Sequence, residues 1–470
     1  MTIVEFNFKI KIPKSQGSIF YEVISKSKKL DFDSLKTKYQ VTLEKITKEI
    51  YVVIVVDDFV KNLITLKHKI MLKHNQIYIY NGTFWEVVEV ETIKTVLYMV
   101  AMMQGVPAYK AKHHSFRQEL YKQVLITIVS PSFSEEDSSR INLQNGTMEF
   151  KGVKATMVEF NQDHFLKYQL SFGFDPLAKA TMFQNYLDKV LPDKTVQMVL
   201  AEFIGSIFIK SGSGIKLEKA LVLFGGGSNG KSVFFEIIQA LLGSNNISNF
   251  SLGSLTDKTG YFRAQIGDKL LNFASEIDKK MNGALFKQLA SNEPVEARHI
   301  YGKPHLIKNY AKLAFNTNVL PIANDNTKAF FRRFIIIPFN VIISEEDQDK
   351  ELHSKIIENE LPGVFNWVIK GLKRVVENKG FTQSDIIDKQ VRVYQTESDT
   401  VRLFILEKKH KKSIKFNYNL NNLFDEYKYF CIEGGYRSLN NIDFSKALKN
   451  IGFQIKRKNI GRFVNVNVED

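Results

Sequence analysis

Residues 221–232 read LVLFGGGSNGKS, four apolar residues followed directly by a glycine-rich turn. The apolar run predicts a buried strand, and apolar residues at helical spacing in 233–242 predict a helix after the turn. Glycines let backbone N–H groups face phosphate oxygens, and the helix start adds a partial positive charge. The turn therefore predicts an ATP site in which Lys231 reaches the β- and γ-phosphates and Ser232 ligates Mg²⁺; the alternative is an ordinary glycine-rich turn. The expected binding residues are Gly225, Gly227, Ser228, Asn229, Gly230, Lys231 and Ser232.

Carboxylates follow the next predicted strand. Residues 269–275 form an apolar run, and Glu276 and Asp278 come directly after it. Carboxylates at the carboxyl edge of a parallel strand lie beside a phosphate loop, where they can hold Mg²⁺ and polarise the attacking water. We expect Glu276 to be the metal ligand and catalytic carboxylate, with Asp278 as the second candidate. The alternative for Asp278 is an acidic start to the helix predicted over 281–290.

A third predicted strand, residues 310–315, ends in Asn316-Thr317-Asn318. A neutral amide at that edge can hydrogen-bond the γ-phosphate or align the attacking water without adding negative charge. We expect Asn318 to play this role, and the alternative is a turn-forming asparagine.

Two arginines, Arg332 and Arg333, precede a further apolar strand over 334–339. An arginine at the edge of such a domain can enter the site of a neighbouring subunit and stabilise transition-state charge. The alternative for one of the pair is a surface salt bridge.

Composition limits the class of protein. The chain has 470 residues, a net charge of +15 and a pI near 9.4, which favour a polyanionic partner or an anionic membrane surface. Because no apolar run approaches the roughly 20 residues of a spanning helix, we expect no membrane partner. The N-terminus lacks an apolar signal core, and the single cysteine, Cys431, excludes internal disulfides and cysteine-based zinc fingers. These features predict a protein of the bacterial or host cytoplasm.

The alternation of apolar runs and helical patterns over 218–340 predicts an α/β fold, a parallel sheet with helices on both faces. Upstream, Tyr51 to Val56 and Gln76 to Tyr80 look like strands, and Asn81-Gly82 and Asn145-Gly146 look like hairpin turns. Helical spacing dominates 176–209. We expect four regions: a small α+β module of unknown role at 1–90, a helical region at 91–210, the ATPase domain at 211–380, and a linker with a DNA-binding domain at 381–470.

The C-terminal region shows two helices followed by a basic hairpin. Leu420, Leu423, Phe424, Tyr427 and Cys431 form one apolar helix face, and residues 443–451 predict a second helix. Helix, helix and basic hairpin is the order of a winged helix, and the alternative is a solvated basic face on a structural domain. The candidate DNA contacts here are Lys446, Lys449, Lys456, Arg457, Lys458 and Arg462.

Together these segments resemble the superfamily 3 helicases, specifically the phage and plasmid primase-helicase group with its poxvirus-type relatives. The resemblance covers roughly residues 95–470 and lies in GGGSNGKS at 225–232, NFASEID at 272–278, KLAFNTNVLP at 312–321 and RRFIIIPF at 332–339. It implies an AAA+-like domain, a hexameric ring and 3′ to 5′ movement on single-stranded DNA.

The resemblance also implies roles for individual residues. The arginine finger best matches Arg333, with Arg332 in reserve. Lys287 matches a lysine-containing helix of the family, and Lys303 and His305 lie at the tip of the segment that matches its DNA-contacting hairpin. A lysine at such a tip would hold backbone phosphates without reading sequence.

Larger members of that group carry a primase, and this chain departs from them. Asp57 and Asp58 form only one adjacent carboxylate pair, too few to place two metals, so we expect any primase to be a separate protein. Replication nickases use two histidines separated by one residue, whereas His113 and His114 are neighbours, so we do not expect a nickase. The sequence therefore predicts an ATP-dependent DNA helicase of a phage, plasmid or other mobile element. The alternatives are a DNA-stimulated ATPase and an ATP-switched replication initiator, neither of which separates strands.

Overall fold

The computed structural model describes residues 14–40, 45–73, 76–128, 139–209, 214–275, 277, 281–300, 302–320, 327–436 and 438–467. The chain divides into two compact units at residues 174 and 175, and each is described by itself. None of the helices in these ranges is both long enough and apolar enough to cross a membrane.

The first unit is built on one helical core. Its helices are α1 (Lys14–Lys26), α2 (Phe32–Lys38), α3 (Lys48–Thr65), α4 (Val90–Met103), α5 (Ala108–Ala111) and α6 (His114–Thr127). Phe20, Phe59, Val96 and Leu120 from α1, α3, α4 and α6 are fully buried in a single cluster. The expected boundary at residue 90 therefore does not coincide with a break in packing, because α4 shares its core with α3.

The strand expected at Tyr51 to Val56 was wrong, because these residues lie in the middle of α3. A run of β-branched residues resembles a buried strand, but here burial on nearly every side of the helix overrides that local preference. Asp57 and Asp58 consequently lie within a helix. Asp57 accepts a hydrogen bond from Tyr39 (2.7 Å), and Asp58 accepts one from Gln104 (2.8 Å).

Two antiparallel sheets complete the first unit. One contains β1 (Lys69–Lys73), β2 (Gln76–Tyr80) and β3 (Trp85–Val87), and the other contains β4 (Ser139–Leu143), β5 (Gly146–Lys151) and β6 (Lys154–Val158). Both expected turns are confirmed: Gly82 (φ +99°) lies between β2 and β3, and Gly146 (φ +140°) follows the turn from β4.

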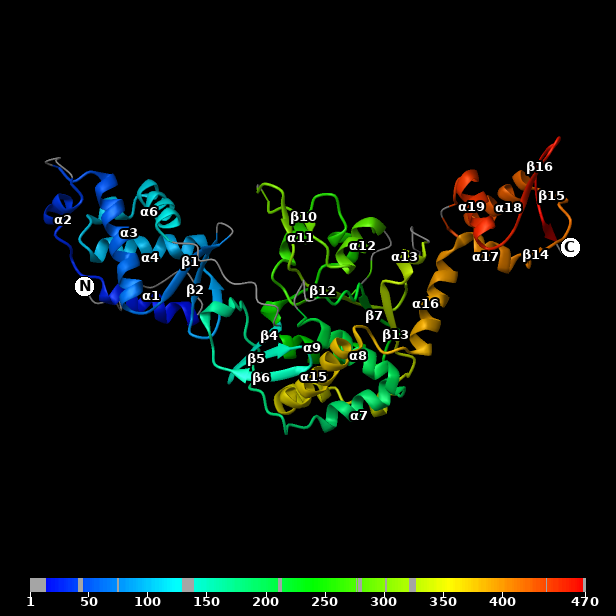
Figure 1. Ribbon diagram of the computed structural model, residues 1–470, viewed down its shortest axis with the longest axis horizontal. Helices are drawn as coiled ribbons and strands as arrows, with labels where there is room; N and C mark the ends of the chain where they lie inside the picture. Colours follow the sequence, from blue (N-terminus) through cyan, green and yellow to red (C-terminus); the bar gives the residue numbers. More distant parts are fainter. Residues whose placement is uncertain are drawn as a thin grey trace. The chain divides into compact units, whose positions relative to one another are not determined.

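The second unit contains a five-stranded sheet whose pairings are all parallel, in the order β13-β7-β12-β9-β8. The strands are β7 (Ala220–Phe224), β8 (Ile247–Ser248), β9 (Leu271–Ala274), β12 (Lys312–Thr317) and β13 (Phe334–Pro338). This arrangement confirms the expected parallel α/β sheet. Helix α9 (Lys231–Leu242) lies on one side of it with α8 (Lys194–Ser206) and α15 (Leu361–Asn378), and α12 (Gly283–Ala290) lies on the other (Figure 1).

Helices α8 and α15 pack with their backbones almost in contact. A Cβ added at Gly371 would lie 2.3 Å from the Ala201 carbonyl, and one added at Gly205 would lie 2.5 Å from the Leu372 amide nitrogen. The carboxylate of Glu360, just before α15, accepts the backbone N–H groups of Met182 and Phe183 at the start of α7 (Thr181–Val190). The other helices of this part are α10 (Leu252–Leu255), α11 (Tyr261–Gln265), α13 (Lys328–Phe331), α14 (Leu352–Asn359) and α16 (Asp385–Ser398).

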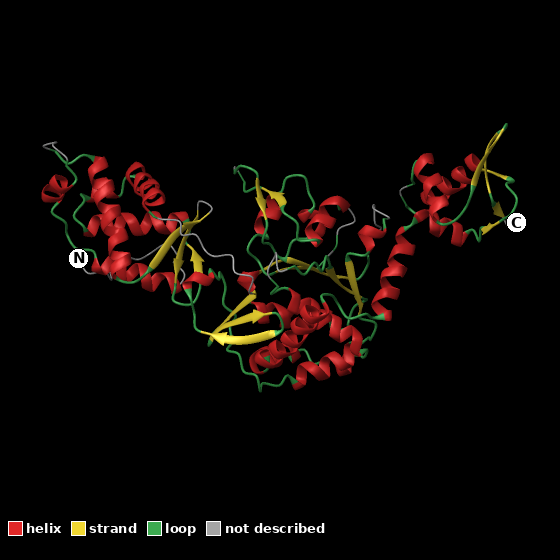
Figure 2. Cartoon of the chain, in the orientation of Figure 1, coloured by secondary structure: helices red, strands yellow, loops and turns green. Residues whose placement is uncertain are grey.

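Residues 400–467 form a small domain with its own core (Figure 2). Its helices are α17 (Thr400–Glu407), α18 (Leu420–Glu433) and α19 (Asn441–Asn450), and its strands are β14 (Lys411–Lys412), β15 (Tyr418–Asn419), β16 (Ile455–Lys458), β17 (Gly461–Val464) and β18 (Val466–Asn467). Phe404, Tyr427 and Phe444 meet at its centre. The expected order of two helices followed by a basic hairpin is present as α18, α19 and β16–β17.

Candidate functional site

The glycine-rich turn leaves β7 and enters α9 directly, as the sequence predicts. Gly225 (φ +154°), Ser228 (φ +55°) and Gly230 (φ +89°) all have positive φ, which turns the loop sharply around the end of the strand. Among the described residues, no side chain caps the start of α9. The N–H groups of its first turn therefore face the loop with their partial positive charge and can bind an anion.

Lys231 is buried beneath this loop and bonded to it. Its Nζ donates to the carbonyls of Gly225 (2.7 Å) and Gly226 (2.6 Å) and to Oδ1 of Asn229 (3.0 Å). Burial lowers the pKa of Lys231, and nearby phosphate groups would oppose that shift by stabilising the charged form. A phosphate ligand would thus compete with the three loop oxygens for the ammonium group.

Asn229 holds the loop against the end of β13. Its Nδ2 donates to the Phe339 carbonyl (2.9 Å), while its Oδ1 accepts from Lys231. A Cβ at Gly225 would lie 2.4 Å from the same Phe339 oxygen, so only glycine fits at that point. The loop is thereby fixed to the strand that follows the two arginines.

Tyr186 of α7 holds the other end of the loop. Its hydroxyl donates to the Gly230 carbonyl (2.8 Å), and burial raises the pKa of this phenol, which keeps it protonated as a donor. A Cβ at Gly230 would lie 2.9 Å from Val190 Cγ1 and 3.1 Å from Tyr186 Cε2. Helix α7 therefore packs directly on the junction between the loop and α9.

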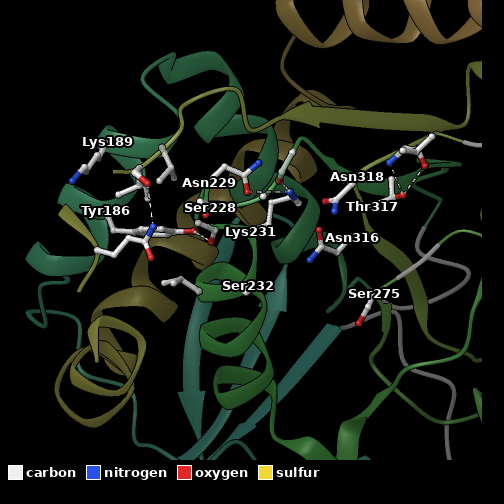
Figure 3. A pocket seen from close by; sticks show the side chains of 18 of the residues that line it. Tyr186, Lys189, Ser228, Asn229, Lys231, Ser232, Ser275, Asn316, Thr317 and Asn318 are labelled. Atoms are coloured by element: carbon white, nitrogen blue, oxygen red, sulfur yellow. Dashed lines mark hydrogen bonds between the residues drawn. The ribbon is translucent and has the colours of Figure 1, made fainter. Parts of the chain in front are cut away.

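A cavity of about 1050 Å³ opens beside the loop. Its lining includes Lys231 and Ser232 at the start of α9 and Asn316, Thr317 and Asn318 at the end of β12. Figure 3 shows the two asparagines on one side of the cavity, facing Lys231. Because β12 lies beside β7 in the sheet, the carboxyl ends of both strands meet here, which is where open parallel sheets bind ligands.

The predicted carboxylates, Glu276 and Asp278, lie outside the described residues. Their flanking residues, Ser275 and Ile277, line the same cavity. Their role as metal and water ligands stays a prediction.

The two predicted arginines differ sharply in environment. The side chain of Arg333 is only 10% exposed, and its guanidinium donates to the Lys287 carbonyl (3.2 Å), the Ser291 hydroxyl (3.0 Å) and the Ala329 carbonyl. The side chain of Arg332 is 58% exposed and pairs with Glu218 (3.0 Å). Arg333 is thus bonded within its own domain, whereas Arg332 lies at the surface.

The predicted DNA-contacting segment is an antiparallel hairpin, β10 (Val295–Ala297) and β11 (His305–Ile307). Lys303 is exposed in the connecting tip, whereas His305 is the first residue of β11 and stacks on His299 with ring centroids 5.4 Å apart. Where the connection leaves β10, the Arg298 guanidinium donates to the Tyr261 hydroxyl (2.9 Å) and lies over its ring. The start of the connection is thus anchored to α11, whereas Lys303 further along it is exposed.

Basic side chains gather on the β16–β17 hairpin of the C-terminal domain. Arg457 and Arg462 are directly opposite each other across the two strands, and both are exposed. Like charges placed opposite each other destabilise a hairpin, and an anion bound between them would relieve the repulsion. Lys456 lies over the Phe416 ring, and Lys458 donates to the Phe416 carbonyl (2.6 Å).

Sequence reasoning did not assign a role to Tyr186 or to Asn316. Tyr186 was visible only as one apolar position of a helix, and nothing local indicates that α7 packs on a loop more than forty residues away. Asn316 lies within the predicted segment 312–321, two residues before Asn318, which is the asparagine that the sequence favours for this role.

Comparisons with known proteins match parts of the chain. Residues 61–192 match a family described as D5 N terminal like, and residues 223–333 match a family of unknown function, DUF5906. The putative helicase L207/L206 of Acanthamoeba polyphaga mimivirus is 26% identical over 192 residues, which are 39% of this chain and only 19% of that protein. Two apo structures of the NrS-1 C-terminal region cover 87% of this chain and 98% of their own at 12% and 13% identity, with a TM-score of 0.47.

The D5 N-terminal-like match and the viral helicase match agree with the resemblance at a coarse level. The D5 N-terminal-like region and the viral helicase relative support a primase-helicase-like family for this chain. The aligned segment covers only 19% of the viral relative's length.

Proposed function

We propose that this chain is an ATP-dependent DNA helicase that serves replication of a phage, plasmid or other mobile element and moves on single-stranded DNA as a ring of identical subunits, with six as the expected number. The observation that carries the proposal is the cavity at the carboxyl ends of β7 and β12, where the uncapped start of α9 and Lys231 face Asn316 and Asn318. Its volume is at the upper end of the roughly 300–1,000 Å³ typical of small-molecule sites.

The residues present fit ATP and Mg²⁺. A Cβ added at Gly226 or Gly227 would meet no atom within 4 Å, so these two residues of the loop border open space in which phosphate groups can lie. Lys231 would exchange the loop carbonyls for the β- and γ-phosphates, and Ser232 with Glu276 would hold the metal. Mg²⁺, when bound, neutralises charge on the transferred phosphoryl group.

The subunit interface is the second part of the proposal. Arg332 is the better candidate to reach a neighbouring site, since Arg333 would have to lose its hydrogen bonds to three groups within its own domain. The exposed tip carrying Lys303 would contact the backbone of single-stranded DNA. The basic hairpin with Arg457 and Arg462 would contact duplex phosphates in the manner of a wing.

The first test is ATP hydrolysis by the full chain with and without single-stranded DNA. We expect DNA to stimulate hydrolysis and Lys231→Ala to abolish it, while Lys370→Ala, an exposed lysine of α15 outside the cavity, serves as the matched control. Equal hydrolysis by the parent chain and Lys231→Ala would contradict the proposal.

A forked duplex with one labelled strand tests helicase activity itself. Hydrolysis without strand displacement would favour a DNA-stimulated ATPase that remodels or packages DNA. Glu276→Gln that leaves turnover unchanged would favour an ATP-switched initiator or a different catalytic carboxylate.

A further inference from the structure

Asn316 is a polar residue of β12 that directly follows the apolar residues Leu313, Ala314 and Phe315. In β12, Leu313 and Phe315 are buried in the cluster on one face of the sheet. Alternation along the strand places Asn316 on the opposite face, in register with Leu223 of β7 and two residues before the glycine-rich loop. Its side chain therefore lies on the α9 side of the sheet, where it lines the cavity.

The oxygen of this amide lacks a partner. Asn316 Oδ1 is buried, and none of the described residues donates a hydrogen bond to it. Asn272, one strand away, shows how a structural amide is satisfied: its Oδ1 accepts from Ser248 Oγ (2.9 Å) and the Phe250 amide (2.9 Å), and its Nδ2 donates to the Phe250 carbonyl (2.8 Å). An unpartnered buried acceptor destabilises the fold, and a ligand that donates a hydrogen bond to Asn316 Oδ1 would remove that cost.

The chemistry of the cavity narrows the identity of that donor. The phosphate oxygens of a nucleotide are acceptors and cannot satisfy another acceptor. Lys231 already donates to three oxygens, and a nucleotide would draw it towards phosphate. A water molecule can donate to Asn316 while its own oxygen faces the γ-phosphate.

We propose that Asn316 orients the water that attacks ATP, an inference that rests on the proposed function. The water oxygen forms a bond to the γ-phosphorus, and the bond to the β–γ bridging oxygen breaks, with its electron pair leaving on ADP. One water proton passes to a base, for which Glu276 is the candidate. The neutral amide of Asn316 takes no proton and holds the second hydrogen of the water.

The test separates turnover, nucleotide affinity and stability. Asn316→Leu keeps the side-chain size but removes the acceptor, so we expect turnover to fall by about 10²-fold because the water loses its orientation. The affinity for a fluorescent ATP analogue with Mg²⁺ should stay within threefold of the parent, about 0.65 kcal/mol at 25 °C, because Asn316 does not touch the nucleotide. The melting temperature without nucleotide should rise, since a buried unsatisfied oxygen is removed.

Two further variants test whether the loss of turnover is specific to the accepting oxygen at position 316. Asn249→Ala, which removes an amide that donates to the Phe273 carbonyl (2.7 Å) beside β9, should lower the melting temperature slightly and leave turnover unchanged. Asn316→Asp keeps an accepting oxygen and should recover part of the turnover, while its added charge weakens nucleotide affinity.

Each alternative outcome overturns the inference in a distinct way. Turnover of Asn316→Leu within twofold of the parent would show that Asn316 binds only a structural water. An affinity loss as large as the turnover loss would show that its amide N–H contacts a phosphate instead. A parent chain that hydrolyses no ATP, or hydrolyses it equally well as Lys231→Ala, would overturn the proposed function and this inference with it.

Discussion

Arg333→Ala and Arg332→Ala are expected to affect different properties of the protein. Arg333 bonds to two carbonyls and one hydroxyl within its own domain, and alanine would remove these bonds, although the Lys287 carbonyl would still accept the Ser291 N–H. At about 1 kcal/mol for each of the three groups that loses the guanidinium, the expected loss of stability is about 3 kcal/mol. For a domain of about 200 residues this corresponds to a fall of about 6–12 °C in melting temperature.

Arg332→Ala removes only an exposed ion pair with Glu218. Such pairs contribute at most about 1 kcal/mol, so the melting temperature should fall by less than about 4 °C. If Arg332 completes the site of a neighbouring subunit, turnover should nevertheless fall by about 10³-fold or more.

Differential scanning fluorimetry and steady-state ATP hydrolysis measure the two effects on the same samples. A mixture of Arg332→Ala with Lys231→Ala provides the decisive control, because a mixed ring contains some sites with an intact loop on one subunit and an intact arginine on the next. We expect the mixture to regain activity that neither variant has alone. Full turnover by Arg332→Ala, or no recovery in the mixture although mixed assemblies form, would refute the reasoning.

Three other perturbations give direct tests. Gly230→Ala should lower both the melting temperature and the nucleotide affinity, because its Cβ would lie 3.1 Å from Tyr186 Cε2 at a position with positive φ. Gly226→Ala, where the added Cβ meets open space, should lower the melting temperature less. Equal falls in melting temperature for the two variants would contradict this reasoning. Lys303→Ala should weaken single-stranded DNA binding and reduce the magnitude of the log–log salt slope by about 1, measured by fluorescence anisotropy, and an unchanged slope would exclude a phosphate contact. Burial lowers the pKa of His410 below its usual value near 6.5, so the unfolded chain binds the proton more readily than the folded chain does. The contribution of neutral His410 to the free energy of unfolding should therefore be fully present above about pH 6.5 and decline below it. His410→Leu should flatten that decline in thermal unfolding of the full chain, and an unaltered pH profile would assign it to other groups.

The sequence predicted best where a local pattern and the global fold agree. The strand, loop and helix around Lys231 follow directly from the spacing of apolar residues and glycines, and the parallel sheet follows from their repetition. The same logic failed at Tyr51 to Val56, where a β-branched run is helical because neighbouring helices bury it. Local patterns express preference, and packing between distant segments decides the outcome.

Residue roles within the site were harder to predict for a related reason. Arg332 and Arg333 are adjacent, and only their burial distinguishes a domain-internal contact from a surface contact. The importance of Asn316 depends on what surrounds its oxygen, and the contact of Tyr186 depends on how α7 docks. None of these properties is encoded within a short window of sequence.

The glycine contacts between α8 and α15 limit how this protein can move. The two backbones are so close at Gly205 and Gly371 that not even a Cβ atom fits between them, so the helices cannot slide past each other without a clash. Glu360 joins α7 to the start of α15, and Tyr186 joins α7 to the glycine-rich loop. A displacement of the loop at Gly230 would therefore move α7, α8 and α15 together as one rigid unit.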